Sequence, residues 1–286
     1  MNDKQLADKV KKGYLRGQGL SLEKGVQLDI LAPSPSNKRN MPNDIARSSL
    51  FVTKAKGVAR KSIKHQRMFH LHKDISIVYT GEELRADDDE IIWMEILNVS
   101  QTVKLGEPFE FNIASLVKAI GWPHNGNYYE KIRQSISRLK TTEILFKNPK
   151  AHGVSSAFSL IQKYDVINDD QAMPSHYRMY LDPEIVLLFV NKNFSSHEWE
   201  AYRKLSPIAR RLADYTQSHK VPNPLDILDF HSLCGSDNGN ISSWKQKVNK
   251  AIGELSDCGI IINGQIENNK IFITRSNSRD LSDIAA

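Results

Sequence analysis

One stretch, Asn240–Leu255, restricts the fold of this 286-residue chain more than any other. Its apolar residues recur at three- and four-residue steps, so they share one face of a helix: Ile241, Trp244, Val248, Ala251, Ile252 and Leu255. The opposite face has no acid before Glu254 and carries groups that can contact phosphates and base edges: Ser242, Ser243, Gln246, Asn249 and Lys250. Two short apolar runs follow, Ile260–Ile262 and Ile271–Thr274. The pattern predicts a DNA recognition helix followed by a hairpin wing.

Composition limits the other classes of protein. The chain has no apolar run of about 18 residues that could span a membrane, and its N-terminus lacks the apolar core of a signal peptide. Cys234 and Cys258 cannot form a disulfide framework, which fits a cytoplasmic protein. The nine His residues show no metal spacing, and no phosphate-binding loop of the P-loop kind occurs. We therefore expect no cofactor, no metal and no enzymatic activity.

The charge of the chain is concentrated near its N-terminus. Residues 1–67 hold 15 Lys/Arg and 5 Asp/Glu, a net charge of +10, whereas residues 68–286 hold 24 and 28, a net charge of −4. This asymmetry favours a polyanion such as nucleic acid as the partner, although a solubilising tail would have the same composition.

Residues 1–66 are predicted to form a flexible basic arm. The segment Ala32–Pro42 contains three prolines in eleven residues, which is typical of a linker. Just before it, Gln27, Leu28, Asp29, Ile30 and Leu31 form a short peptide whose aliphatic side chains can dock in a pocket. This peptide resembles the pentapeptide by which bacterial replication proteins bind the sliding clamp.

The folded body is predicted to start near Met68, with strands at Met68–Leu71 and Ile75–Tyr79. Helices are then expected from Ala86–Glu90 to about Val99, over Phe109–Trp122 and over Asn127–Lys140. The triple Asp, Asp87–Asp89, could be read as a metal site, but capping of a helix start explains it better. Further elements are a strand at Glu143–Phe146, a strand within Ala157–Val166, a strand at Tyr177–Leu181, a short helix from Pro183 to Val190, and helices at Ser206–His219 and Leu225–Cys234.

Two segments have the same layout of helix, glycine, Asn-Gly turn, helix and strand: Phe111–Phe146 and Leu225–Ile262. The step from Leu139 to Ile144 equals the step from Leu255 to Ile260. The repeat predicts an α+β fold with two tandem winged-helix domains, 67–190 and 191–275, followed by a disordered tail, 276–286. Two ordinary helix pairs remain the alternative.

Four blocks of sequence carry a resemblance to a known family: Met41–Phe51, Tyr79–Glu90, Tyr202–Arg211 and Leu233–Asp237. They closely resemble the TrfA replication initiators of broad-host-range bacterial plasmids. The resemblance implies a protein with two winged-helix domains that binds iteron repeats at an origin, helps to melt it, and brings in the initiator DnaA, the helicase DnaB and the sliding clamp. It also implies a monomer–dimer equilibrium. The family's clamp peptide usually ends in Leu-Phe, whereas the peptide here ends in Ile30-Leu31.

Under this reading the two polar helix faces enter successive major grooves of double-stranded DNA, and the melted single strand is a further candidate partner. In the second domain we expect Gln246, Asn249 and Lys250 to read bases, and Ser242, Ser243 and Lys247 to contact phosphate. In the first domain Lys131, Gln134, Ser137 and Arg138 are expected to act in the same way. Arg210 and Arg211 are expected to clamp phosphates, although one of them could instead pair with an acid inside the domain.

Two other functions are compatible with the same sequence features. A strand-nicking enzyme could hold a divalent metal with His70 and His72 and use Tyr128 or Tyr129 as its nucleophile. No third ligand stands out in the sequence. A sequence-specific transcription repressor would need the same winged helices but would have no use for a clamp peptide.

Overall fold

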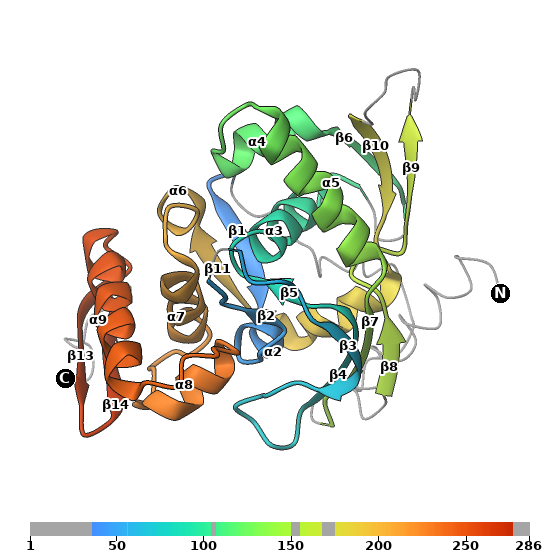
Figure 1. Cartoon of the computed structure of the whole chain (residues 1–286). Helices are drawn as coiled ribbons and strands as arrows, with labels where there is room; N and C mark the ends of the chain where they lie inside the picture. The colour runs from blue at the N-terminus through green and yellow to red at the C-terminus, as the bar shows by residue number, and fades with distance from the viewer. Residues whose placement is uncertain (1–35, 56, 104–106, 150–154, 168–174, 277–286) are drawn as a thin grey trace, which may run out of the picture.

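The computed structural model describes residues 36–55, 57–103, 107–149, 155–167 and 175–276 (Figure 1). Helices and strands are interspersed along the chain, which confirms the α+β prediction. The peptide Gln27–Leu31 and most of the predicted tail lie outside the described residues. No helix among the described residues is long and apolar enough to cross a membrane.

A first unit is built around three helices and a three-stranded sheet. Its elements are α3 (Asp89–Ser100), β6 (Phe109–Asn112), α4 (Ile113–Ile120), α5 (Gly126–Lys140), β9 (Lys163–Ile167) and β10 (His176–Tyr180). The predicted helix Phe109–Trp122 is therefore shorter than expected. Its first four residues form β6, because Asn112 is extended and its side chain caps α4 by accepting from the backbone N of Ser115. The strands have the order β6-β10-β9.

A second unit repeats this order of elements. It contains α7 (Pro207–Gln217), β12 (Leu225–Asp226), α8 (Ile227–Leu233), α9 (Ile241–Asp257), β13 (Ile261–Glu267) and β14 (Lys270–Arg275). Its strands have the order β12-β14-β13, which corresponds strand by strand to β6-β10-β9. Each unit thus runs helix, strand, helix, helix and hairpin, with the first strand paired to the last.

The repeat differs from the sequence prediction in one respect. The strand after α5, β7 (Glu143–Lys147), and its neighbour β8 (Ser155–Phe158) belong to a separate sheet with β3 (Ser62–Arg67) and β4 (Ser76–Glu82), in the order β3-β4-β7-β8. The counterpart of the β13–β14 hairpin is therefore β9–β10. The segment Ala157–Val166 is divided between the two sheets because Leu160 and Ile161 turn into the core. Met68–Leu71, predicted as a strand, lies between β3 and β4.

The N-terminal arm is shorter than predicted, because residues 38–55 and 57–66 belong to the folded body. β1 (Lys38–Pro42) pairs antiparallel with β11 (Phe194–Glu198), α2 (Asn43–Ala46) follows it, and β2 (Phe51–Val52) pairs with β5 (Leu84–Arg85). Three side chains of this segment, Met41, Ile45 and Phe51, are completely buried. The prolines of Ala32–Pro42 suggested a linker, but the burial of these apolar residues outweighs that local signal.

The two units share one continuous hydrophobic core. Between their main elements lie the 3-10 helix η2 (Pro183–Lys192), which confirms the short helix predicted from Pro183 to Val190, and the short α6 (Trp199–Tyr202). In Figure 1, α9 lies at one end of the molecule and α5 lies toward the other, with α6 and α7 between them. The β1–β11 pair crosses the middle, so the N-terminal segment contacts the linker between the units.

Candidate nucleic-acid interface

The helix α9 is fixed in place through its apolar face. Trp244, Val248 and Leu255 are completely buried, and α9 packs on both α7 and β13. The indole N–H of Trp244 donates to the carbonyl of Ile227 at the start of α8 over 3.2 Å. Asn240 caps the helix by accepting from the backbone N of Ser243 at 3.0 Å. Because its inner face is held at several points, α9 presents its other face in a fixed orientation.

The outer face of α9 carries the predicted polar residues. Five of the six are exposed, namely Ser242, Gln246, Lys247, Asn249 and Lys250. Ser243 is half-buried, and its hydroxyl accepts from the amide of Asn238 at 3.3 Å. In the part of the chain that the structure describes, neither Lys247 nor Lys250 forms an ion pair. Glu254 is turned to α7, where it accepts from the backbone N of Ser206 at 2.8 Å. This face is therefore cationic.

The corresponding face of α5 makes more contacts with other side chains of the protein. Gln134 and Ser137 are exposed, but the Gln134 amide donates to Glu130 at 3.0 Å. Lys131 lies 3.2 Å from a carboxylate oxygen of Asp87, with its ammonium 5.2 Å from the centre of the Trp122 ring. Three of the four predicted residues on α5 are thus accessible, and two of them have acidic partners.

Arg138, the fourth predicted residue on α5, is buried and cannot reach DNA in this structure. Its Nη2 lies 2.9 Å from Asp89 and 3.4 Å from Asp88, at the start of α3. Ser135 also donates to Asp89, at 2.7 Å. The helical periodicity placed Arg138 on the border of the polar face, where a buried acid draws it inward. Its predicted DNA contact is wrong, and its role is to join α5 to α3.

Arg210 and Arg211 are also buried, so their prediction as phosphate clamps is wrong. Arg211 Nη1 lies 2.7 Å from Glu90 and 2.9 Å from Asp214, and its Nη2 donates to the carbonyls of Ala46 and Ser48. Arg210 donates to the carbonyl of Ala86 and, at 3.1 Å, to that of Leu205. Both guanidinium groups on α7 therefore fasten the second unit to α3 and its neighbours.

The acids around Arg211 are perturbed by burial. Loss of water raises the pKa of Glu90 to about 8, and the charge of Asp214 adds to this effect, whereas Arg211 opposes it. The pKa of Asp214 is lowered despite its burial, because His197 donates to it and Arg211 lies beside it. Asp88, Asp89 and Glu90 thus act inside the fold, whereas Asp87 is partly exposed. This agrees with the structural reading of Asp87–Asp89, and Asp88 caps α3 through the backbone N of Asp89.

The residues considered for a strand-nicking enzyme, His70, His72, Tyr128 and Tyr129, make contacts within the fold. The ring Nδ1 of His70 lies within hydrogen-bonding distance of the backbone of His72, 2.9 Å from its N and 3.1 Å from its O. Tyr129 contacts His124 through its hydroxyl, and Tyr128 packs on Trp122. Among the described residues, no three His, Cys, Asp or Glu side chains gather in a group that could hold a metal ion.

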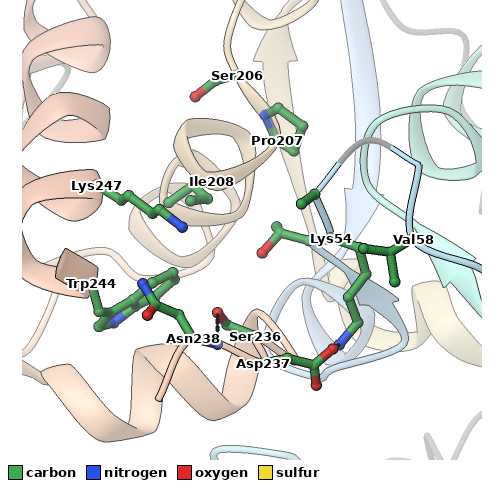
Figure 2. A pocket seen from close by; sticks show the side chains of 12 residues that line it. Lys54, Val58, Ser206, Pro207, Ile208, Ser236, Asp237, Asn238, Trp244 and Lys247 are labelled. Atoms are coloured by element: carbon green, nitrogen blue, oxygen red, sulfur yellow. Dashed lines mark hydrogen bonds and ion pairs between the residues drawn. The ribbon is translucent and has the colours of Figure 1, made fainter. Parts of the chain in front are cut away.

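Sequence reasoning missed a basic segment beside α9. Lys54 lies 2.6 Å from Asp237, and its ammonium also donates to the carbonyl of Gly235 at 2.5 Å. A hollow of about 420 Å³ separates this segment from Lys247 and Trp244 of α9 (Figure 2). The signal in the sequence is the run of basic residues from Lys54 to Arg67, of which all but Arg67 fall within the predicted flexible arm, 1–66.

The chain is similar in sequence to one family of known proteins. The family model for the TrfA protein matches residues 5–275. The plasmid replication initiator protein TrfA of Escherichia coli is 38% identical over 254 residues, which cover 88% of this chain and 66% of that protein. The chain therefore spans slightly less than two thirds of that relative's length.

Solved structures show the same fold at low identity. One structure of domains 2 and 3 of RctB has a TM-score of 0.59 and 14% identity, and covers 82% of this chain and 99% of that one. A second structure of RctB domains 2–3 has a TM-score of 0.54 and 12% identity, and covers 80% of this chain and 94% of that one. With a family model that matches nearly its whole length, this chain belongs to the TrfA family.

Proposed function

We propose that this protein is a plasmid replication initiator whose two repeated units are tandem winged-helix domains that bind iteron repeats at the origin. The name of its Escherichia coli relative supports the role in replication. The repeated order of helix, strand, helix, helix and hairpin supports the winged-helix assignment. It makes α5 and α9 the recognition helices and β9–β10 and β13–β14 the wings.

The observation that carries this proposal is the outer face of α9. Gln246, Asn249 and Lys250 are exposed on a helix whose other face is buried from Trp244 to Leu255. Amide and ammonium groups on such a face can pair with base edges in a major groove. Glu254, the nearest acid toward the end of the helix, is held by the start of α7 and does not oppose DNA. We assign base reading to these three residues and phosphate contacts to Ser242, Ser243 and Lys247.

In the first unit, Lys131, Gln134 and Ser137 of α5 are proposed to contact the neighbouring groove. Their partners Asp87 and Glu130 must be displaced or shared when DNA binds. Breaking these contacts opposes the gain from DNA contacts, so α5 should contribute less affinity than α9. The two helices belong to one continuous core, which supports binding to a site of fixed length.

The proposed cycle includes host proteins. Binding of the iterons would help to melt the origin and recruit DnaA, DnaB and the sliding clamp, the last through Gln27–Leu31. Self-association to a dimer would limit the amount of DNA-binding monomer. A pull-down of the clamp by the full chain tests the peptide. We expect binding that is lost in Gln27→Ala/Leu31→Ala, and equal recovery of clamp with both proteins would contradict the assignment.

Footprinting of the full chain on the origin region of its own plasmid tests the proposal as a whole. We expect protection at directly repeated sites in one helical phase, with contacts in two successive major grooves of each repeat. Protection at a single operator beside a promoter, without repeats, would instead favour the transcription repressor. Relaxation of supercoiled origin DNA in the presence of Mg²⁺ or Mn²⁺ would favour the nicking enzyme.

A further inference from the structure

The segment Lys54–Arg67 is the most basic part of the folded chain. It contains six Lys or Arg residues among its 14 residues and no Asp or Glu. It leads from β2 to the end of β3, the edge strand of the four-stranded sheet. The positive charges of such a segment repel one another. This repulsion is offset by acidic side chains of the protein or by an anionic partner.

One end of the segment lies beside the recognition helix α9. Lys54 is held by Asp237, in the turn between α8 and α9. Figure 2 shows Lys54 and Val58 on one side of the hollow and Lys247 on the opposite side, pointing into it. Lys247 borders the polar face of α9. The start of the segment is therefore a neighbour of the α9 surface that we propose to contact DNA.

The middle of the segment lies beside the recognition helix α5. Arg60 contacts Asp88 at 2.5 Å and Asp89 at 2.7 Å. The same Asp89 binds Arg138 of α5, and the adjacent Asp87 binds Lys131. Lys131 borders the polar face of α5 as Lys247 borders that of α9. The segment thus connects the two proposed reading surfaces along the body of the protein.

Four cations of the segment fall into two groups, and Arg67, at its end, donates to the carbonyl of Lys73. Lys54 and Arg60 are largely buried and committed to acids. Lys61 is 62% exposed, and its distance of 3.6 Å from the exposed Asp237 makes only a weak pair. Lys64 is exposed and has no acid partner among the residues that the structure describes. The second group leaves positive charge at the surface that the fold itself does not neutralise.

We propose that Lys61 and Lys64 bind phosphates of the DNA backbone between the two grooves that α5 and α9 enter. This inference rests on the proposed function, because it assumes that both helices contact one DNA site. A duplex carries one negative charge per about 1.7 Å of its axis, so the backbone between two grooves always offers phosphates to such a segment. Two lysines there add affinity and fix the position of the protein, but they carry no sequence information.

Salt-dependent binding of the full chain to an origin fragment and to a scrambled fragment tests this assignment. Replacing each lysine with Gln removes its charge but keeps a polar side chain, and both sites are exposed enough to leave the thermal unfolding midpoint unchanged. We expect Lys61→Gln/Lys64→Gln to make the slope of log K against log salt shallower by about two units, since each phosphate contact contributes about 0.9. The ratio of affinities for the two fragments should stay the same.

Lys220→Gln is the matched control for Lys64→Gln. Lys220 is exposed and follows the C-terminal end of α7, whereas the hollow adjoins the N-terminal end, and an 11-residue helix is about 16 Å long. We expect the control to keep the wild-type slope, and hydroxyl-radical footprinting should show that only the double variant loses protection between the two grooves. A wild-type slope in the double variant, or an equal change in the control, would overturn the inference. If the wild-type chain fails to prefer the origin fragment, the proposed function itself is wrong.

Discussion

Arg211 of α7 and Glu90 of α3 form a contact of 2.7 Å between two side chains that have no exposed surface. The same guanidinium reaches Asp214 on its own helix and the backbone carbonyls of Ala46 and Ser48 that follow β1. One side chain therefore holds the first helix of the second unit, the first helix of the first unit and the N-terminal segment. We infer that this cluster sets the relative orientation of the two units.

Removing the cation should destabilise the whole protein. Arg211→Met leaves the carboxyl groups of Glu90 and Asp214 in the core without their guanidinium, and breaking a buried pair of this kind costs about 3–5 kcal/mol. Urea denaturation followed by circular dichroism measures the free energy of unfolding. Lys204→Met is the control, since its pair with Glu200 spans 3.9 Å between side chains that are both 67% exposed and should contribute less than about 1 kcal/mol. Similar losses in both variants would contradict this account.

The same cluster should make stability depend on pH. Burial raises the pKa of Glu90 from 4.5 to about 8, so between these values the folded protein binds a proton that the unfolded chain has lost. The contribution of Glu90 to the free energy of unfolding is therefore complete below pH 4.5 and is lost as the pH rises toward 8. The slope of this loss is at most about 1.4 kcal/mol per pH unit. Unfolding free energies measured from pH 5 to 9 should fall less steeply in Glu90→Gln. Parallel curves would show that Glu90 is ionised throughout.

On α5, substitution of Arg138 should affect the stability of the protein, whereas substitution of Gln134 should affect DNA binding. Arg138→Gln removes one of the two cations beside the buried Asp89, leaving Arg60, and should lower the free energy of unfolding by about 1.5–3 kcal/mol. Gln134→Ala alters only an exposed contact with Glu130, so it should weaken binding to the iteron by about 1–3 kcal/mol if Gln134 reads a base, with little effect on stability. Denaturation and titration of both variants test the pair. A specific binding defect in Arg138→Gln at full stability would restore the DNA contact that we rejected.

The two cysteines should differ in reactivity. Burial raises the pKa of the Cys234 thiol to about 12, and its carbonyl accepts from the backbone N of Thr53 at 2.7 Å. At pH 8 the Cys234 thiol would therefore stay protonated, and its burial would keep it from reagents. Iodoacetamide should therefore modify the half-buried Cys258 first and Cys234 only after unfolding. Fast modification of both in the native protein would show that the segment after β2 detaches from α8.

Periodicity in the sequence was enough to find α5 and α9, the two helices that we propose as recognition helices. The apolar steps from Trp244 to Leu255 predicted the buried face of α9, and the turn at Asn125-Gly126 marked the start of α5. These signals are local, since a helix that packs on one side must repeat its apolar residues at helical spacing. The hairpin after α9 was also predictable from two apolar runs separated by Asn268 and Asn269, whose left-handed backbone suits a tight turn.

The burial of three arginines could not be predicted from periodicity. Arg138, Arg210 and Arg211 occupy positions that a helical projection cannot separate from solvent-facing ones. What buries them is a set of acids at the start of α3, distant in sequence from all three. The length of the N-terminal arm was overestimated for a related reason. Its charge and prolines are local features, whereas the pairing of β1 with β11 joins residues more than 150 positions apart.

The measurement that tests the account most directly is the affinity of the full chain for a single iteron, with and without Lys250. We expect Lys250→Ala to weaken binding by about 1–3 kcal/mol and to relax discrimination at one base pair. Lys220→Ala, which removes an exposed lysine that follows α7 and is not part of the polar face of α9, should keep both the affinity and the discrimination. If Lys250→Ala binds the iteron with wild-type affinity and discrimination, α9 does not read DNA as we propose.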